Sequence, residues 1–138
     1  MGAPFVHRLR VRFHECDPQG VVFNAHYFTY VDVALTEMWR AAFGSYQNVV
    51  EQGTDVVVVE ASARFRASAR FDEEIAVELA IERLGTTSMT TATAVRRDDR
   101  LLVEGRIVHV FVDPATMAKQ EIPAHVRAGL TPYTIGDD

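Results

Sequence analysis

The sequence is poor in cysteine, in lysine and in long apolar runs. Cys16 is its only cysteine, which excludes an intrachain disulfide and a cysteine-based zinc site. Lys119 is its only lysine, and 14 basic residues stand against 19 acidic ones among 138 residues, for a net charge of −5. An acidic chain without a basic cluster is a poor binder of nucleic acid, because contacts to phosphates dominate that affinity.

Two further absences concern membranes and secretion. The apolar runs are short, such as Val56–Val59, whereas a membrane span needs about 20 apolar residues. The N-terminal stretch Met1–Arg12 lacks the apolar region of a secretory signal. We therefore expect a cytoplasmic protein that does not enter a membrane. Its length predicts a single domain over residues 1–138, since one core usually serves about 100–200 residues.

Hydrophobic periodicity predicts a strand followed by a helix in the N-terminal third. Apolar and polar residues alternate over Phe5–Glu15, which is typical of a half-buried strand. Over His26–Phe43 the apolar residues recur at helical spacing and occupy most of the surface, which predicts one enclosed helix. Asn24 fits its N-cap, and Gly44 fits the position just after its end.

After Thr54 the period changes to two, which predicts consecutive strands. In the first of them, Val57, Val59 and Ala61 are expected to share one face. The order is thus one strand, one helix and four strands joined by short turns, which favours an antiparallel sheet. We expect an α+β fold in which a five-stranded antiparallel sheet is wrapped around one long central helix. The expected strands are Thr54–Ser68, Glu74–Arg83, Thr87–Arg97 and Leu101–Val112, with a short helix over Pro123–Leu130.

The segment between the first strand and the helix is the candidate site. It places the carboxylate of Asp17 at an Asp-Pro-x-Gly turn that Gly20 completes, and a helix N-terminus with unpaired N–H groups follows. Such N–H groups could polarise a carbonyl oxygen while the carboxylate attacks the carbon or activates water. The alternative is that Asp17 only starts the turn, and the residues alone favour that interpretation.

A longer pattern runs through this loop and into the helix, Asp17-Pro18-x-Gly20-x-Val22-x-Asn24-x-x-Tyr27, continued by Thr36-Glu37-Met38. It resembles the signature of the 4-hydroxybenzoyl-CoA thioesterase-like family, which are hotdog-fold acyl-CoA thioesterases. The later run Ile81-x-x-Leu84-Gly85-x-x-Ser88 is similar to a turn between two sheet strands in bacterial members. The resemblance extends from about Phe5 to Val112.

The resemblance implies roles for residues of the loop and the helix start. Asp17 matches the catalytic aspartate, which acts as nucleophile or general base, and Gly20 matches the loop glycine. Asn24 occupies the position whose backbone N–H faces the thioester oxygen, and Tyr27 matches a tyrosine near the pocket. His26 either contacts the substrate or only sits in the first helical turn. The family further implies a dimer, commonly doubled to a homotetramer.

Other residues have alternative interpretations. Arg64 and Arg66 share a strand face, which is either solvated or a patch for the phosphates of coenzyme A. We expect Cys16 to be a small strand-end core residue. Glu37 is expected to be a carboxylate on the helix surface or a buried structural one, rather than a second catalytic acid. His109 lies in an apolar run and is expected to be a hydrogen-bonded core residue. No histidine pair has ligand spacing, so we expect no metal site.

The sequence therefore predicts an acyl-CoA thioesterase that hydrolyses a thioester to a carboxylic acid and free coenzyme A. No metal or redox cofactor is expected, since coenzyme A is part of the substrate. The expected partners are the acyl-CoA and further copies of the chain. Two alternatives are a hydratase or dehydratase of acyl thioesters, whose acid/base set usually includes a histidine, and a non-catalytic acyl-CoA-binding module. Fold analogy alone does not separate them.

Overall fold

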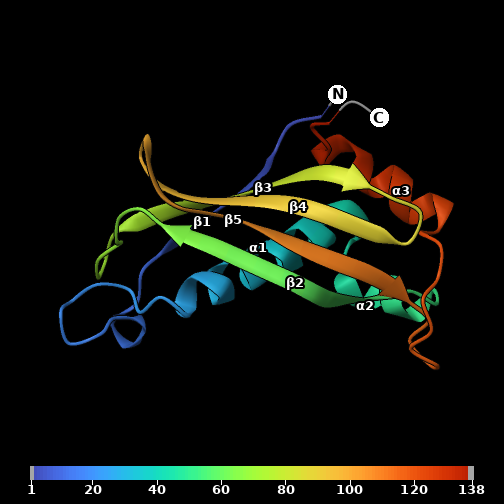
Figure 1. The fold of residues 1–138 in the computed structure, drawn as a ribbon, viewed down its shortest axis with the longest axis horizontal. Coiled ribbons are helices and arrows are strands. Elements are labelled where there is room, and N and C mark those ends of the chain that lie inside the picture. Colours follow the sequence, from blue (N-terminus) through green and yellow to red (C-terminus); the bar gives the residue numbers. More distant parts are fainter. Residues whose placement is uncertain (1, 137–138) are drawn as a thin grey trace.

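The computed structural model describes residues 2–136, which form one curved antiparallel sheet with helices at one face and one end (Figure 1). The strand order is β1-β3-β4-β5-β2, so that β1 and β2 are the edge strands. The elements in chain order are β1 (Phe5–Arg10), η1 (Phe13–Glu15), α1 (His26–Phe43), α2 (Tyr46–Glu51), β2 (Asp55–Phe65), β3 (Glu74–Leu84), β4 (Ser88–Arg97), β5 (Arg100–Val112), α3 (Ala124–Leu130) and η2 (Thr131–Tyr133).

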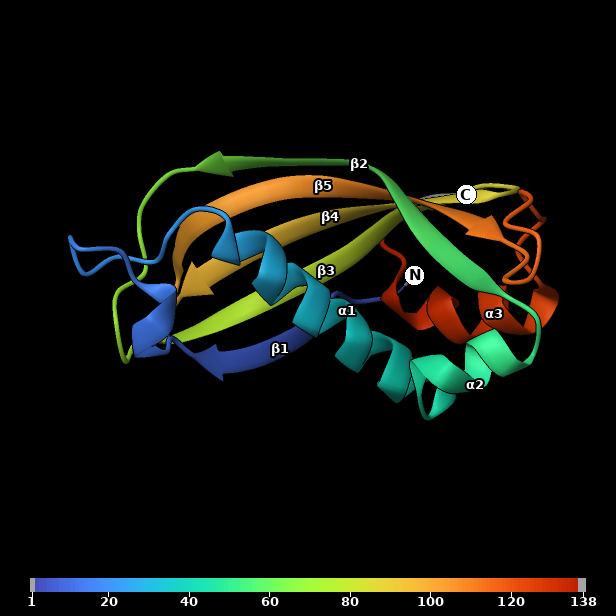
Figure 2. The ribbon, with the colours of Figure 1, turned by 90° about the horizontal axis from the view of Figure 1, so that it is seen from below.

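The core lies between α1 and the sheet. Figure 2 shows α1 running along the concave face of the sheet, with α2 and α3 at the end away from the loop that precedes α1. The inward side chains of β3, among them Val77, Leu79 and Ile81, are fully buried. The α+β class, the five antiparallel strands and the bounds of the 18-residue helix α1 agree with prediction. The buried residues of α1 recur every three or four positions and are Tyr27, Tyr30, Val31, Ala34, Leu35, Met38 and Trp39.

The two ends of α1 are built differently. The N-cap is Ala25, whose backbone is itself helical and whose side chain makes no capping hydrogen bond, so the prediction of Asn24 as N-cap is wrong. At the other end, Gly44 has φ +86°, a conformation that favours glycine. Its N–H donates to the Arg40 carbonyl at 2.8 Å. The N-terminus of α1 is therefore left with backbone donors that no side chain of a capping residue satisfies.

The first strand is shorter than predicted. It ends at Arg10, and the predicted strand residues Phe13–Glu15 form the 3₁₀ turn η1 instead. The cause is local, because the carboxylate of Glu15 accepts hydrogen bonds from the backbone N–H and the guanidinium of Arg12. These bonds close a tight turn that a strand cannot make.

A bulge in β2 corrects the expected faces of that strand. The pairing with β5 shifts between Val58 and Glu60, so that Val58 lies opposite His109 and Ala61 lies opposite Ile107. His109 and Ile107 are buried beneath α1, and a single extra residue reverses the alternation on one side of a bulge. The prediction that Val57 shares a face with Ala61 is therefore wrong.

Candidate active site

The loop that contains Asp17 is a closed hairpin-like turn. A β-bridge joins Cys16 to Val22 at its base. Beyond the bridge, the Asp17 N–H donates to the Val21 carbonyl at 2.8 Å, and the Gly20 N–H donates to the Asp17 carbonyl at 2.9 Å. Gly20 has φ +79°, which explains why glycine ends the Asp-Pro-x-Gly run. The main chain on both sides of Asp17 is thus fixed by hydrogen bonds within the loop.

The side chain of Asp17 is half-buried, and its Oδ1 accepts the Gln19 N–H at 2.8 Å. One carboxylate oxygen therefore makes the usual turn contact of an aspartate. The second oxygen, Oδ2, makes no hydrogen bond within residues 2–136. The geometry is thus consistent with Asp17 as a turn residue. It also leaves one carboxylate oxygen available to attack a substrate or to accept a proton.

The N-terminus of α1 offers two unpaired backbone donors. The His26 N–H donates to the Phe23 carbonyl at 2.9 Å, and the Tyr27 N–H donates to the Asn24 carbonyl at 3.2 Å. Asn24 and Ala25 are exposed, and their N–H groups meet no acceptor within the described part of the chain. Unpaired donors at the positive end of a helix dipole attract a developing negative charge. Of the three N–H groups of Asn24, Ala25 and His26, only the one on His26 is already occupied within the described residues.

The side chains of Tyr27 and His26 lie in different surroundings. Tyr27 is buried and its hydroxyl accepts the Ala69 N–H at 2.9 Å. Burial raises the pKa of Tyr27, so the phenol stays neutral. His26 is half-buried, with its ring centroid 6.3 Å from that of Phe23 and 6.4 Å from that of His14. Tyr27 therefore fixes the segment before β3, whereas His26 lies against the start of the helix.

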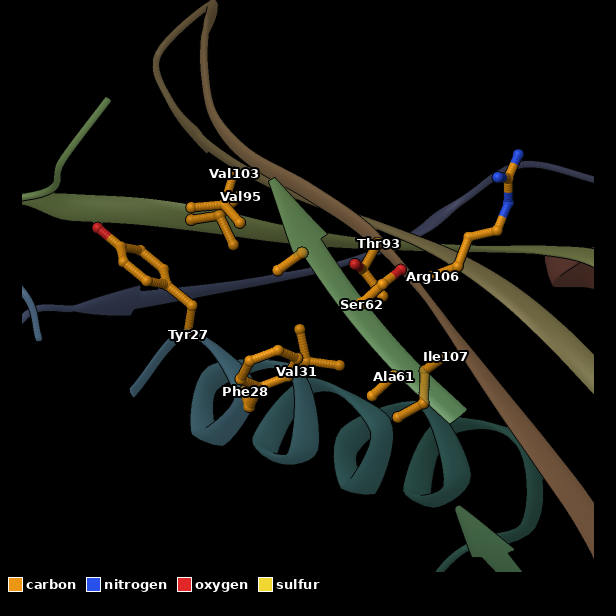
Figure 3. A pocket seen from close by; sticks show the side chains of 11 residues that line it. Tyr27, Phe28, Val31, Ala61, Ser62, Thr93, Val95, Val103, Arg106 and Ile107 are labelled. Carbon is orange, nitrogen blue, oxygen red and sulfur yellow. The ribbon is translucent and has the colours of Figure 1, made fainter. Parts of the chain in front are cut away.

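A small cavity separates α1 from the sheet beside Tyr27. Figure 3 shows the side chains of α1 on one side and those of the strands on the other. The volume of the cavity is about 20 Å³, which is room for about one water molecule. Its walls are mostly apolar, although Ser62, Thr93 and Arg106 also line it. The other wall residues include Tyr27, Phe28 and Val31 of α1, Ala61 of β2, Val95 of β4 and Ile107 of β5.

A buried carboxylate for which the sequence predicted no role lies directly beneath the loop. The Glu15 side chain is 1% exposed, and its Oε1 accepts the Tyr30 hydroxyl and the Arg12 N–H, both at 2.8 Å. Burial by itself would raise the pKa of Glu15, but the hydrogen bonds from Arg12 and Tyr30 hold it below its ordinary value. Burial and the bond to Glu15 raise the pKa of Tyr30. The pair therefore consists of an ionised carboxylate and a neutral phenol.

The structure distinguishes the two arginines proposed for coenzyme A. Arg66 Nε donates to Glu104 Oε2 at 2.9 Å, so its charge is already paired. Arg64 is exposed, makes no ion pair within residues 2–136, and lines a depression of about 490 Å³ together with Glu104 and Arg106. Arg106 is paired with Glu82 at 2.7 Å. Arg64 is thus the cation of this depression that an anion can reach.

Three other residues weighed in the sequence have clear surroundings. Cys16 is half-buried at the base of the loop, and Glu37 pairs with Arg40 at 3.2 Å on the surface of α1. His109 is 4% exposed, but its Nδ1 has no hydrogen-bond partner within residues 2–136. His109 is therefore buried as expected, but its Nδ1 does not make the expected hydrogen bond.

Residues 2–136 contain no group of three or more histidine, cysteine, aspartate or glutamate side chains that could hold a metal ion. In the same part of the chain, every helix is too short or too polar to cross a membrane.

Comparisons with known proteins show which family this chain is similar to. The model of the thioesterase superfamily matches residues 19–104. The acyl-CoA thioester hydrolase YbgC of Escherichia coli is 30% identical over 121 residues, covering 87% of this chain and 90% of that protein. The 4-hydroxybenzoyl-CoA thioesterase of a Pseudomonas species is 27% identical over 131 residues, covering 83% and 89%. Among solved structures, a hypothetical protein of Aquifex aeolicus superposes with a TM-score of 0.87 at 28% identity, covering 92% of this chain and 99% of that one.

Proposed function

Since the chain belongs to the thioesterase superfamily and has the hotdog thioesterase fold, we propose that it hydrolyses an acyl-CoA to a carboxylic acid and free coenzyme A. The observation that carries the proposal is the arrangement around the loop. A carboxylate oxygen of Asp17 is free at a hydrogen-bonded turn, and the unpaired N–H groups of Asn24 and Ala25 follow at the start of α1. The reaction needs these two features, a nucleophile or base and an oxyanion site.

The proposed mechanism begins with the thioester carbonyl oxygen at the N–H groups of Asn24 and Ala25. These donors and the helix dipole stabilise the negative charge that develops on this oxygen. In one route, Asp17 attacks the carbonyl carbon, the carbon–sulfur bond breaks, and coenzyme A leaves as a thiolate that takes a proton from water. Water then hydrolyses the mixed anhydride. In the other route, Asp17 removes a proton from a water molecule that attacks the carbon directly. The carbon–sulfur bond then breaks, and the leaving thiolate takes the proton that Asp17 holds.

The acyl group is proposed to lie beside Tyr27, between α1 and the sheet. The walls of the cavity there are mostly apolar, which suits a hydrocarbon or aromatic acyl group. At about 20 Å³ the cavity is too small for such a group, so that side chains must move when it binds. Phe28, which is 42% exposed, is the wall residue freest to swing outward. His26 is proposed to contact the substrate at the mouth of the same site.

The phosphates of coenzyme A are assigned to Arg64. An acidic protein needs a local positive charge to bind a polyanion, and Arg64 is exposed without an ion pair among the described residues. Arg66 is a weaker candidate, because a phosphate would have to compete with Glu104 for it. The proposed chemistry uses a carboxylate, backbone donors and water, and thus no metal or redox cofactor. We further propose that residues 1–138 form one domain.

The alternative of a hydratase or dehydratase is less favoured. That chemistry requires an acid/base set that acts on the acyl chain rather than on the thioester carbonyl, and the loop here presents Asp17 first. A non-catalytic acyl-CoA-binding module would have no use for a free carboxylate oxygen at the helix start. The relatives named above as hydrolases also favour hydrolysis.

The proposal is tested by the release of free thiol from a panel of acyl-CoAs with short, long and aromatic acyl groups. We expect steady turnover of at least one member by the purified full chain. Binding of acyl-CoA without thiol release would support the non-catalytic module, and water addition to an unsaturated acyl-CoA would support the hydratase.

A further inference from the structure

We propose that Glu15 and Tyr30 form a clamp that sets the position of the Asp17 loop against the N-terminus of α1, and that thioester hydrolysis depends on it. The inference rests on the proposed function, since it concerns the geometry of that same site. Glu15 and Tyr30 do not reach the substrate in this proposal. They are positioning residues that act through Asp17 and through the backbone donors of the helix.

The carboxylate of Glu15 is held on both oxygens. Oε1 accepts the Tyr30 hydroxyl and the Arg12 N–H at 2.8 Å each, while Oε2 accepts Nε of Arg12 at 2.9 Å. Both Glu15 and Tyr30 are 1% exposed. A buried carboxylate with all of these donors in place cannot turn or shift without losing several charge-assisted hydrogen bonds together. Its position is therefore strongly determined.

The clamp connects three segments that meet at the site. Asp17 follows Glu15 by two residues, so the Glu15 side chain anchors the chain as it enters the loop. The Glu15 carbonyl accepts the Phe23 N–H at 2.9 Å, which anchors the chain as it leaves the loop for the helix. Tyr30 is four residues after His26, one turn into α1. One residue thus ties the entry of the loop, its exit and the first turn of the helix together.

The rate of catalysis is more sensitive to this arrangement than the ability of the chain to fold. The carboxylate of Asp17 and the N–H groups of Asn24 and Ala25 must meet the two ends of one carbonyl bond. A displacement of about 1 Å can cost on the order of 100-fold in rate, whereas the fold tolerates such a shift in an exposed loop. A loosened clamp should thus lower kcat without preventing folding.

The chain offers a matched control at the opposite end of α1. The Tyr46 hydroxyl donates to the carboxylate of Asp55 and also accepts the Val56 N–H at 3.3 Å, so that Tyr46→Phe removes a tyrosine–carboxylate bond, as Tyr30→Phe does, together with one backbone contact. Both changes keep the ring and delete one oxygen. Tyr46 begins α2, beyond the C-terminal end of α1 and far from the loop (Figure 2). Comparing the two variants separates loss of a tyrosine–carboxylate bond from loss of the clamp.

The experiment measures kcat, KM and Tm for the full-length wild type, Tyr30→Phe and Tyr46→Phe with the best acyl-CoA of the panel. We expect Tyr30→Phe to lower kcat by about 10-fold or more, with KM changed by about twofold or less. Tyr46→Phe should keep kcat within about twofold of wild type at a similar loss of Tm. A Tyr30→Phe variant with the kcat of Tyr46→Phe would overturn the clamp while leaving the thioesterase proposal standing.

A second variant tests the other half of the pair. Glu15→Gln keeps the length of the side chain but removes the charge, and we expect it to lower kcat at least as much as Tyr30→Phe. The double variant should be no slower than the slower single variant by more than about twofold, because each change breaks the same unit. Effects that multiply would contradict a shared clamp. If Glu15→Gln does not fold, the comparison of the two tyrosine variants decides alone, and a wild type inactive on every acyl-CoA overturns both proposals.

Discussion

His109 is the residue whose surroundings predict the clearest dependence of stability on pH. It is buried beneath α1, and burial lowers its pKa to about 4, against the weaker opposing effect of Asp32. Well above pH 6.5 the histidine is neutral in both the folded and the unfolded chain, so there it does not make stability depend on pH. Between about pH 6.5 and 4 the unfolded chain binds a proton that the folded chain does not, and stability falls as the pH falls.

We expect the free energy of unfolding to drop by about 2 kcal/mol between pH 7 and pH 5 on account of His109. Urea unfolding at the two pH values measures this loss. The variant His109→Gln cannot take up the proton and should lose most of the pH dependence over this range. The same pH dependence in variant and wild type would assign it to another group.

Local chemistry made the turn of the loop predictable, whereas the side chains that support the loop from beneath depend on tertiary contacts and could not be predicted. An Asp-Pro-x-Gly run predicts a turn from its own residues, and the structure has that turn at Asp17 and Gly20. The role of Glu15 depends on Tyr30, which lies 15 residues away on another element. A hint was available, because a tyrosine on the buried face of a helix usually needs a partner for its hydroxyl. The sequence does not say which residue that partner is.

At the scale of elements, long periodic segments were predictable and short or irregular ones were not. The 18 residues of α1 repeat the helical period often enough to set both ends. The six residues of α2 span fewer than two turns, too few to show a period. The bulge between Val58 and Glu60 adds one residue to a strand and leaves no mark in the pattern of apolar residues. The bulge is seen only in the register of the pairing between β2 and β5.

Arg64, near the end of β2, is the residue that we predict to contact the phosphates of coenzyme A. Reversal of the free charge by Arg64→Glu should raise KM for the acyl-CoA by about 10-fold or more, because phosphates are then repelled. KM for a truncated thioester that lacks the nucleotide should hardly change. Arg66→Glu is the matched control, since the Arg66 charge is already paired with Glu104, and it should have a smaller effect. Equal effects of Arg64→Glu on both substrates would exclude a phosphate contact.

At the scale of the molecule, the order of the strands in the sheet could not be predicted from the sequence. The edge strand β1 pairs with β3, and β2 crosses to the far side to pair with β5. Alternation shows that a segment is a strand and which of its faces is apolar, but not which strand lies beside it. The hairpins β3–β4 and β4–β5 were the exceptions, because short turns join consecutive antiparallel strands.

The exposed edge of the sheet supports the expectation of a homo-oligomer. β2 is hydrogen-bonded to β5 on one side, and its Val58 and Val59 are 55% and 57% exposed. An unpaired apolar edge is a surface on which a second chain can add its own strand. We predict a dimer or a dimer of dimers, measured by sedimentation at micromolar concentration. A single species near 15.4 kDa would contradict it.

The central claim is that Asp17 does chemistry as well as forming a turn, and the variant Asp17→Asn separates the two roles. An asparagine Oδ1 can still accept the Gln19 N–H that Asp17 Oδ1 accepts now, so the turn and the Tm should change little. The amide can neither attack the thioester nor take a proton from water, and general-base help alone is worth about 10²–10⁴-fold. We therefore expect kcat of the full-length chain to fall by at least about 100-fold while acyl-CoA still binds. Near-normal turnover by a folded Asp17→Asn variant would show that Asp17 is only a turn residue and would contradict the mechanism.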